Sequence, residues 1–379
     1  MPHHAALIFP GQGAQRVGMG REFYETSEAA RTIFDQADRL LGNDLKSVIF
    51  EGPPEKLTQT AFCQPAILTV SVAALKALQA HPQFQNLAVR FAAGLSLGEY
   101  SALVAAGALT FEDALRLVER RAFFMEEAAR LAQGTMAAVI GFDRDRLLKI
   151  CSETGAEVAN FNSPEQIVIT GGLEKVREAC RRIQAEGPTS AAATKFSGIS
   201  SGTSARGASP PSASRPLVGT EHPPIVGEQV PPHPLSALAE YKTKESCKGT
   251  RAEDPARGAK SVIPLEVSGA FHSSLMQPAA RKFEGELKKV SFQSCRIPVV
   301  SNVHAQPHRD PDSIRRDLAR QIVSSVRWEE SVRTIASQGI TDFIEIGPGK
   351  VLKGLVRRID PSLRVCTIER PEDIEGLPF

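Results

Sequence analysis

Apolar positions recur along this chain in two patterns, short apolar runs and longer stretches with helical spacing. Residues 5–9 and 87–93 are largely apolar runs of strand length, and each ends at a glycine-rich turn. Residues 21–41 and 64–80 repeat apolar positions at helical intervals, and 111–131 forms a long amphipathic stretch. The pattern predicts strands that alternate with helices in the first third of the chain.

The middle of the chain follows a different order of elements. Its spacing predicts two helices among four strands, in the order β-α-β-β-α-β, which is that of a split βαβ or ferredoxin-like unit. These elements are strand 135–141, helix 144–153, strands 156–160 and 166–170, helix 173–185 and strand 260–267.

Strand and helix patterns alternate again in the last hundred residues. Alternation on both sides of the central unit predicts an α/β protein, in which a mostly parallel sheet is interrupted by a small inserted domain. The expected elements are helices 277–289, 312–337 and 350–358 and strands 297–302 and 342–346.

One segment of the central unit has a low-complexity composition. Residues 188–256 hold 10 Pro, 10 Ser and 6 Gly, which is 26 of 69 residues, and such a share without a period is typical of disorder. We expect either a lineage-specific disordered loop or translated non-coding sequence, such as a retained intron. The mass of the purified protein, compared with 40.9 kDa, distinguishes the two.

The predicted domains follow from these patterns. Residues 1–131 and 269–379 form a discontinuous α/β catalytic domain, 132–268 form the small ferredoxin-like domain, and 188–256 are an insert within it. A loop on a domain surface accommodates a long insertion at small entropic cost.

Composition excludes several classes of protein. The net charge is +2, from 45 basic and 43 acidic residues, so no excess charge favours nucleic acid or a membrane surface. No window holds 18 consecutive apolar residues and the N-terminus lacks a signal-peptide pattern, so we expect neither a membrane span nor a leader. Six scattered cysteines without a C-x-x-C pair indicate reduced thiols and a cytoplasmic protein.

Residues 94–98, Gly-Leu-Ser-Leu-Gly, match G-x-S-x-G between a predicted strand and a predicted helix. This context is that of a nucleophile elbow, in which glycines permit a sharp turn that exposes the serine at a helix N-terminus. Ser96 is then the candidate nucleophile, and the backbone N–H of Leu97 is a candidate oxyanion donor. The alternative is a turn with a helix-capping serine.

A serine nucleophile needs a base, and most of the eight histidines stand in unpromising sequence. Two lie at the N-terminus, two in the insert, and two beside prolines in loop-like segments, which leaves His272 and His304. His272 stands at the end of an element, where catalytic groups collect. Taken alone, a histidine there is more often a structural residue, and no Asp or Glu stands out as a third triad member.

A series of segments resembles one enzyme family, in the family's own order. The chain is similar to the malonyl-CoA:acyl carrier protein transacylase family, the acyltransferase of fatty acid synthesis. The resemblance implies a hydrolase-like α/β domain interrupted by a ferredoxin-like one. The segments are LIFPGQGAQ (7–15), QPAILTVSVAAL (64–75), GLSLGEYSALVAAGAL (94–109), LVERRAFFMEEA (117–128), GTMAAVIG (134–141), NFNSPEQIVITG (160–171), FHSSLMQPA (271–279), PVVSNV (298–303) and EIGPGKVL (345–352).

The resemblance implies a role for each matching residue. Ser96 takes the malonyl group as an ester, and His272 is the base that deprotonates it. The imidazole is oriented by a main-chain carbonyl, for which Gln321 is the matching residue. Gln12 and Leu97 supply the two backbone N–H groups of the oxyanion hole.

The resemblance also implies how the substrate is selected. Arg121 pairs with the malonyl carboxylate, since a guanidinium binds a carboxylate bidentately and keeps its charge. Without the resemblance, the sequence favours a solvated helix charge for Arg121. Phe271 matches the malonyl-selective pattern, because a smaller residue there leaves room for a methyl branch.

Two residues depart from the family pattern. Leu95 stands where the family usually has histidine, and Ser325 stands where it usually has proline. The histidine that the family usually has there is not the base. We therefore expect activity to survive with Leu95, with altered local packing or substrate contacts.

The expected enzyme moves malonyl from coenzyme A to the phosphopantetheine thiol of acyl carrier protein, through a malonyl-serine intermediate. We expect no metal or redox cofactor, a local basic surface for an acidic carrier protein, and a monomer. Two alternatives remain open: a serine esterase or thioesterase, which needs no Arg121, and a scaffold of the same fold that the insert or Leu95 has disabled.

Overall fold

The computed structural model describes residues 2–42, 44–186, 261–265, 267 and 269–378. The described elements belong to one compact unit, which comprises 1–187 and 259–379. The expected disordered insert at 188–256 lies outside the described residues.

A six-stranded sheet with the order β10-β9-β1-β2-β7-β8 forms the larger layer of the fold. Every pairing in it is parallel except that of β7 with β8. The central strand β1 is buried on both faces, which is why it appears in the sequence as a continuous apolar run. The strands are β1 (His3–Phe9), β2 (Leu87–Gly94), β7 (Val299–Val300), β8 (Pro307–His308), β9 (Asp342–Ile346) and β10 (Arg364–Ile368).

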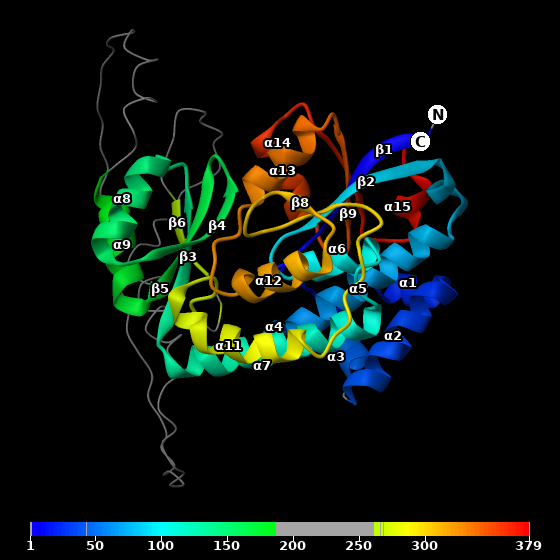
Figure 1. Ribbon diagram of the computed structural model, residues 1–379, viewed down its shortest axis with the longest axis horizontal. Coiled ribbons are helices and arrows are strands. Elements are labelled where there is room, and N and C mark those ends of the chain that lie inside the picture. Colours follow the sequence, from blue (N-terminus) through cyan, green and yellow to red (C-terminus); the bar gives the residue numbers. More distant parts are fainter. Residues whose placement is uncertain (1, 43, 187–260, 266, 268, 379) are drawn as a thin grey trace, which may run out of the picture. The chain divides into compact units, whose positions relative to one another are not determined.

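Helices pack on both faces of this sheet, and Figure 1 shows their arrangement. They are α1 (Arg21–Thr26), α2 (Glu28–Leu41), α3 (Leu45–Glu51), α4 (Pro54–Thr58), α5 (Thr60–Ala80), α6 (Gly98–Ala105), α7 (Phe111–Leu131), α11 (Gln277–Leu287), α12 (Pro311–Gln321), α13 (Trp328–Ser337), α14 (Val351–Ile359) and α15 (Glu372–Glu375), with short 3-10 helices η1 (Pro82–Asn86) and η3 (Ser274–Met276). Helices α5, α7, α11 and α14 lie within a few residues of their predicted bounds, whereas α3, α4 and α15 were not predicted.

Two predicted helices are each broken into two. The stretch 21–41 divides at Ser27, which is extended and whose side chain accepts from the Ala30 N–H to cap α2. The stretch 312–337 divides between α12 and α13, because the Val326 N–H donates to the Ala159 carbonyl 2.8 Å away. A contact from another part of the chain therefore ends the helical pattern there.

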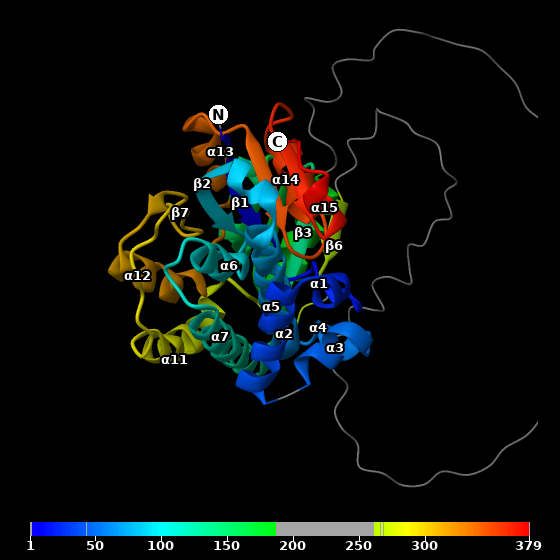
Figure 2. The same cartoon turned by 90° about the vertical axis from the view of Figure 1, so that its right-hand side faces the viewer.

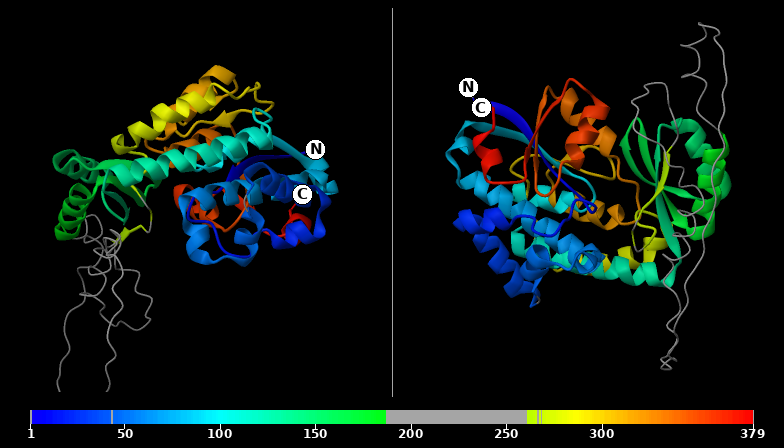
Figure 3. Two further views of the ribbon diagram at one scale, coloured as in Figure 1. Left: turned by 90° about the horizontal axis from the view of Figure 1, so that it is seen from below. Right: turned by 180° about the vertical axis from the view of Figure 1, so that it is seen from behind.

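The apolar helix α5 lies at the centre of the larger layer, among α2, α6 and α7 (Figure 2). Among the described residues, α5 is the one helix long and apolar enough to cross a membrane, judged by length and composition only. Of the 18-residue window that meets this criterion, 83% is buried inside the structure. Burial of this kind is that of a core helix. The long helix α7 packs along α11, and Figure 3 shows the two side by side.

The second sheet is antiparallel and has the order β4-β5-β3-β6. Its elements follow the predicted β-α-β-β-α-β order, and its two helices pack on one face, over an apolar cluster that includes Leu147, Ile169 and Ile183. The division into two domains with the bounds given above remains a prediction. The elements are β3 (Gly134–Ile140), α8 (Arg144–Thr154), β4 (Glu157–Ser163), β5 (Gln166–Gly172), α9 (Leu173–Ala185) and β6 (Ser261–Pro264).

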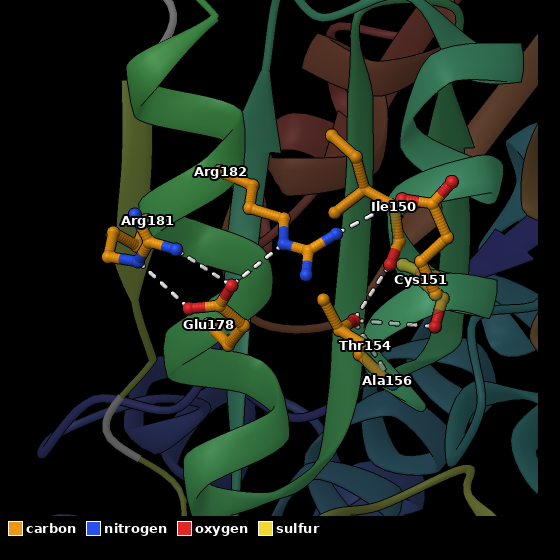
Figure 4. Close-up of polar contacts among 8 residues, drawn as sticks. Ile150, Cys151, Thr154, Ala156, Glu178, Arg181 and Arg182 are labelled. Carbon is orange, nitrogen blue, oxygen red and sulfur yellow. Dashed lines mark hydrogen bonds and ion pairs between the residues drawn. The ribbon is translucent and has the colours of Figure 1, made fainter.

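A cluster of ion pairs joins the two helices of this sheet (Figure 4). Glu178 on α9 accepts hydrogen bonds from Arg181 and Arg182, and Arg182 also reaches Glu153 on α8, 3.0 Å away. At the end of α8 the Thr154 hydroxyl donates back to the Ile150 carbonyl at 2.8 Å. These ion pairs therefore connect α8 and α9 on the exposed side of the two helices. Exposed pairs of this kind add little to the free energy of unfolding.

Candidate active site

The turn from β2 into α6 carries Ser96 in a left-handed conformation. Its φ of 53° is rare for a residue with a side chain, and such a turn places the side chain at the end of the strand. Gly94 and Gly98 make the turn sterically feasible: a Cβ on Gly94 would lie 2.0 Å from the Gly98 carbonyl carbon. The G-x-S-x-G spacing is thus required by a backbone crossing.

Asn302, just after β7, holds this turn by its side-chain amide. Its Oδ1 accepts from the Ser96 N–H at 2.6 Å, and its Nδ2 donates to the Gly94 carbonyl at 2.7 Å. Asn302 lies in the segment PVVSNV (298–303), and its role was not predicted from the sequence. A polar residue at the carboxyl end of a parallel strand was the available signal, because such ends meet at one edge of the sheet.

The structure brings His272 to Ser96 although the two are 176 positions apart. His272 Nε2 lies 2.8 Å from Ser96 Oγ, and His272 Nδ1 lies 2.8 Å from the main-chain oxygen of Gln321. A carbonyl only accepts, so Nδ1 carries the proton and Nε2 is left free to accept from the serine hydroxyl. The pair has the geometry of a nucleophile and a base.

The environment of His272 keeps the imidazole neutral. Its exposed fraction is 5%, and burial, assisted by the positive charge of Arg121, lowers the pKa of His272 to about 4. A neutral imidazole is the form that can take a proton from Ser96.

Arg121 reaches the same hydroxyl from helix α7. Its Nη2 donates to Ser96 Oγ at 2.9 Å and to Gln321 Oε1 at 3.1 Å, and its Nη1 donates to Gln64 Oε1 at 2.6 Å. Its exposed fraction is 1%, so it is not a solvated helix charge, and burial lowers the pKa of the guanidinium. The three oxygens that accept from it are all neutral, which leaves a buried positive charge beside the serine.

The structure places the remaining predicted residues around this group. Leu97 follows Ser96 at the start of α6 and is buried. The turn that carries Gln12 lies against the elbow, since a Cβ on the adjacent Gly11 would lie 2.4 Å from the Leu95 carbonyl oxygen. Phe271, directly before His272, is buried, and its carbonyl accepts from the Thr170 hydroxyl at 2.9 Å.

The two positions that depart from the family pattern also have defined contacts. The Leu95 side chain packs against the apolar cluster that includes Ile8 and Trp328. The Ser325 hydroxyl donates to the Val158 carbonyl at 2.6 Å. Sequence reasoning gave no role to Gln64, which lies in the quoted segment 64–75 and hydrogen-bonds Arg121.

Comparison with known proteins agrees with this architecture. The family model for the acyl transferase domain matches residues 6–200. The malonyl CoA-acyl carrier protein transacylase of Bacillus subtilis is 38% identical over 375 residues, which cover 98% of this chain and 95% of the relative.

Solved structures give the same result. The malonyl CoA-acyl carrier protein transacylase from Coxiella burnetii matches with a TM-score of 0.77 and 32% identity, over 99% of this chain and 97% of that one. A malonyl-transacylase solved with its type II polyketide acyl-carrier protein matches with a TM-score of 0.77 and 31% identity, over 99% and 98% of the two chains.

The parallel sheet, the serine elbow and the domain match together define an acyl transferase. Because full-length relatives at this identity share one description, the chain belongs to the malonyl CoA-acyl carrier protein transacylase family.

Proposed function

We propose that the protein transfers a malonyl group from coenzyme A to the phosphopantetheine thiol of acyl carrier protein, for fatty acid biosynthesis. The observation that carries the proposal is the buried Arg121 guanidinium, 2.9 Å from the Ser96 hydroxyl and beside neutral oxygens alone. A site built in this way suits an acyl group that ends in a carboxylate. The names of the relatives support the same substrate and carrier.

In the first half-reaction, Ser96 Oγ attacks the thioester carbonyl as His272 Nε2 takes the hydroxyl proton. The Oγ–C bond forms, the C–S bond breaks, and the proton passes from His272 to the departing sulfur of coenzyme A. The distance of 2.8 Å between Oγ and Nε2 is suited to this transfer. The product is a malonyl-serine ester.

The second half-reaction runs through the same groups in reverse. The carrier thiol gives its proton to His272 Nε2 and attacks the ester, the C–Oγ bond breaks, and the proton returns to Ser96 Oγ. The Gln321 carbonyl at His272 Nδ1 keeps the imidazole in the required tautomer in both halves.

The backbone N–H groups of Gln12 and Leu97 stabilise the oxyanion that forms in each half-reaction. The close approach of the turn at Gly11 to the Leu95 carbonyl supports this pairing. Donors fixed by the backbone need no reorganisation as the charge develops, which is the main advantage of such a site.

Substrate choice rests on Arg121. A malonyl carboxylate replaces the neutral oxygens around the guanidinium with an anion, whereas acetyl leaves the buried charge without one, at a cost. Phe271 limits the space beside His272, which disfavours a branched acyl group.

The cellular setting completes the proposal. The described cysteines 63, 151, 180, 295 and 366 are free thiols, which supports a cytoplasmic enzyme. We also propose that the enzyme works as a monomer. We also propose the two-domain division 1–131 with 269–379, and 132–268.

Labelled malonyl-CoA tests this function, with and without acyl carrier protein, for the wild type and Ser96→Ala. We expect labelled enzyme that passes its label to the carrier, and no labelling of Ser96→Ala. Release of free malonate alone would establish a hydrolase instead, and an unlabelled wild type would establish a non-catalytic scaffold.

A further inference from the structure

Glu99 is a buried acid for which the reaction above has no use. It lies in the first turn of α6, three residues after Ser96, and its exposed fraction is 1%. Its Oε2 accepts from two neutral amide groups, the side-chain Nε2 of Gln321 at 2.6 Å and the backbone N–H of Asn302 at 3.3 Å. Burial of a carboxyl group is unfavourable unless such contacts compensate it, so its position calls for an explanation.

The Gln321 side chain connects Glu99 to Arg121. Its Nε2 donates to Glu99 Oε2 and also to the Ser96 carbonyl at 3.0 Å, while its Oε1 accepts from Arg121 Nη2. A reversed amide would direct its NH₂ group at the guanidinium, which is repulsive, and its oxygen at Glu99, which is repulsive when Glu99 is ionised. Glu99 and Arg121 therefore impose the same orientation on Gln321 from opposite sides.

The same oxygen of Glu99 also supports the nucleophile. Asn302, whose backbone N–H donates to Glu99, accepts from the Ser96 N–H through its side chain. Gln321, the other residue bound to Glu99, presents its main-chain carbonyl to His272. One carboxyl oxygen thus contacts both residues that hold the serine and the histidine.

We propose that Glu99 is a positioning residue that acts through Gln321 and whose charge sets how tightly Arg121 holds a substrate carboxylate. The inference rests on the proposed function. The charged and titratable groups around Glu99 are Arg121 and Tyr100, the acid Asp317 on α12, and His272 across Gln321. Among these groups Arg121 carries the positive charge, since His272 is neutral, so an ionised Glu99 and a bound carboxylate compensate the same charge.

Glu99 ionises within a range of pH in which KM can be measured. Burial, aided by the negative charge of Asp317, raises the pKa of Glu99 to about 8, against the opposing hydrogen bonds of Gln321 and Asn302 and the charge of Arg121. Below that pH, Glu99 is neutral and Arg121 offers its full charge to the substrate. Above it, Glu99 is an anion that already compensates the charge of Arg121. The carboxylate of malonyl-CoA must then compete with Glu99 for Arg121, or Glu99 must take up a proton when the substrate binds.

The pH dependence of KM for malonyl-CoA tests the proposal, with the full-length enzyme and acyl carrier protein. We expect the wild-type KM to be level below that pKa and to rise above it, by up to about tenfold per pH unit. Glu99→Gln keeps an oxygen for the two amides but does not ionise, so its KM stays level across the range. A Glu99→Gln enzyme whose KM rises as in the wild type would overturn the proposal.

Glu345→Gln is a matched control. Glu345 is another buried acid, whose pKa burial raises to about 7, and it caps α14 by accepting from the Leu352 and Lys353 N–H groups. Its substitution should leave the wild-type rise in KM in place, whereas loss of the rise would assign the effect to Glu345 and overturn the proposal.

The outcomes separate this inference from the function on which it rests. A wild type that transfers no malonyl at any pH overturns both. A wild type that transfers malonyl, with a pH profile of KM identical to that of Glu99→Gln, overturns the inference alone.

Discussion

His272 Nδ1 lies 2.8 Å from the main-chain oxygen of Gln321, so the proposed base is oriented by a carbonyl and not by a carboxylate. A carbonyl fixes the tautomer but supplies no full negative charge to stabilise the imidazolium that forms during the reaction. The nearby Arg121 charge disfavours that cation further. In the proposed mechanism, the base is therefore hard to protonate in the resting enzyme.

This arrangement predicts an acyl-enzyme formation rate that is insensitive to pH in the neutral range. The base must be neutral, and a pKa lowered to about 4 means that His272 binds a proton only when the pH falls through that value. Single-turnover labelling with malonyl-CoA measures the rate. A loss of rate centred on the ordinary histidine value of 6.5 would contradict the assignment.

Replacement of Arg121 by alanine should impair malonyl transfer more than acetyl transfer. A hydrogen bond to a charged group contributes about 1.5–3 kcal/mol, so kcat/KM for malonyl-CoA should fall by roughly 10- to 150-fold. Arg120→Ala is the matched control, because Arg120 is the preceding residue of α7 but stacks on Phe124 at the surface. Equal malonyl rates for Arg121→Ala and the wild type would refute the carboxylate contact.

The sequence predicts most of the larger sheet, for a physical reason. A parallel strand that is buried on both faces becomes a continuous apolar run, as at 5–9. The breaks at Ser27 and between α12 and α13 follow from a cap and from a distant backbone contact. Neither the cap nor the distant contact changes the periodic spacing of apolar residues in the sequence.

The candidate site also contains some residues that the sequence predicts and others that it does not. Ser96 stands in a local motif whose glycines are required by the crossing of the backbone at Gly94 and Gly98. Asn302 and Glu99, by contrast, act through hydrogen bonds to residues about 200 positions away. A polar residue at the end of a predicted strand indicates an edge of the sheet but not its bonding partner, so the fold was needed to identify these contacts.

Asn302→Ala should destabilise the elbow. The substitution leaves the Ser96 N–H and the Gly94 carbonyl without the amide that now binds both. A buried polar group left unpaired costs about 1–3 kcal/mol, so urea unfolding should show a loss of that size, together with slower labelling of Ser96. The exposed Asn86 serves as the control, and its replacement by alanine should leave the free energy of unfolding nearly unchanged. Equal stability of the two variants would argue against the role of Asn302.

Gly98→Ala adds a single methyl group, but it should lower both the stability of the protein and its activity. A Cβ at this position would lie 2.1 Å from the Phe9 carbonyl oxygen and 2.9 Å from that of Pro10, and both belong to the backbone that leads into the Gln12 turn. Relief of this overlap must separate β1 from the elbow, so we expect a loss of at least about 1–3 kcal/mol in the free energy of unfolding. Acyl-enzyme formation should fall with it, because Gln12 and Ser96 are displaced relative to each other.

Gly285→Ala is the matched substitution on helix α11. A Cβ there would meet no heavy atom of the described residues within 4 Å, apart from its own helix backbone and chain neighbours. Alanine is favoured over glycine inside a helix by about 1 kcal/mol, so this variant should be slightly more stable than the wild type and equally active. Urea unfolding and malonyl labelling of the two variants, measured side by side, decide the matter. Equal stability of Gly98→Ala and the wild type would show that the crossing of β1 and the elbow is not tight.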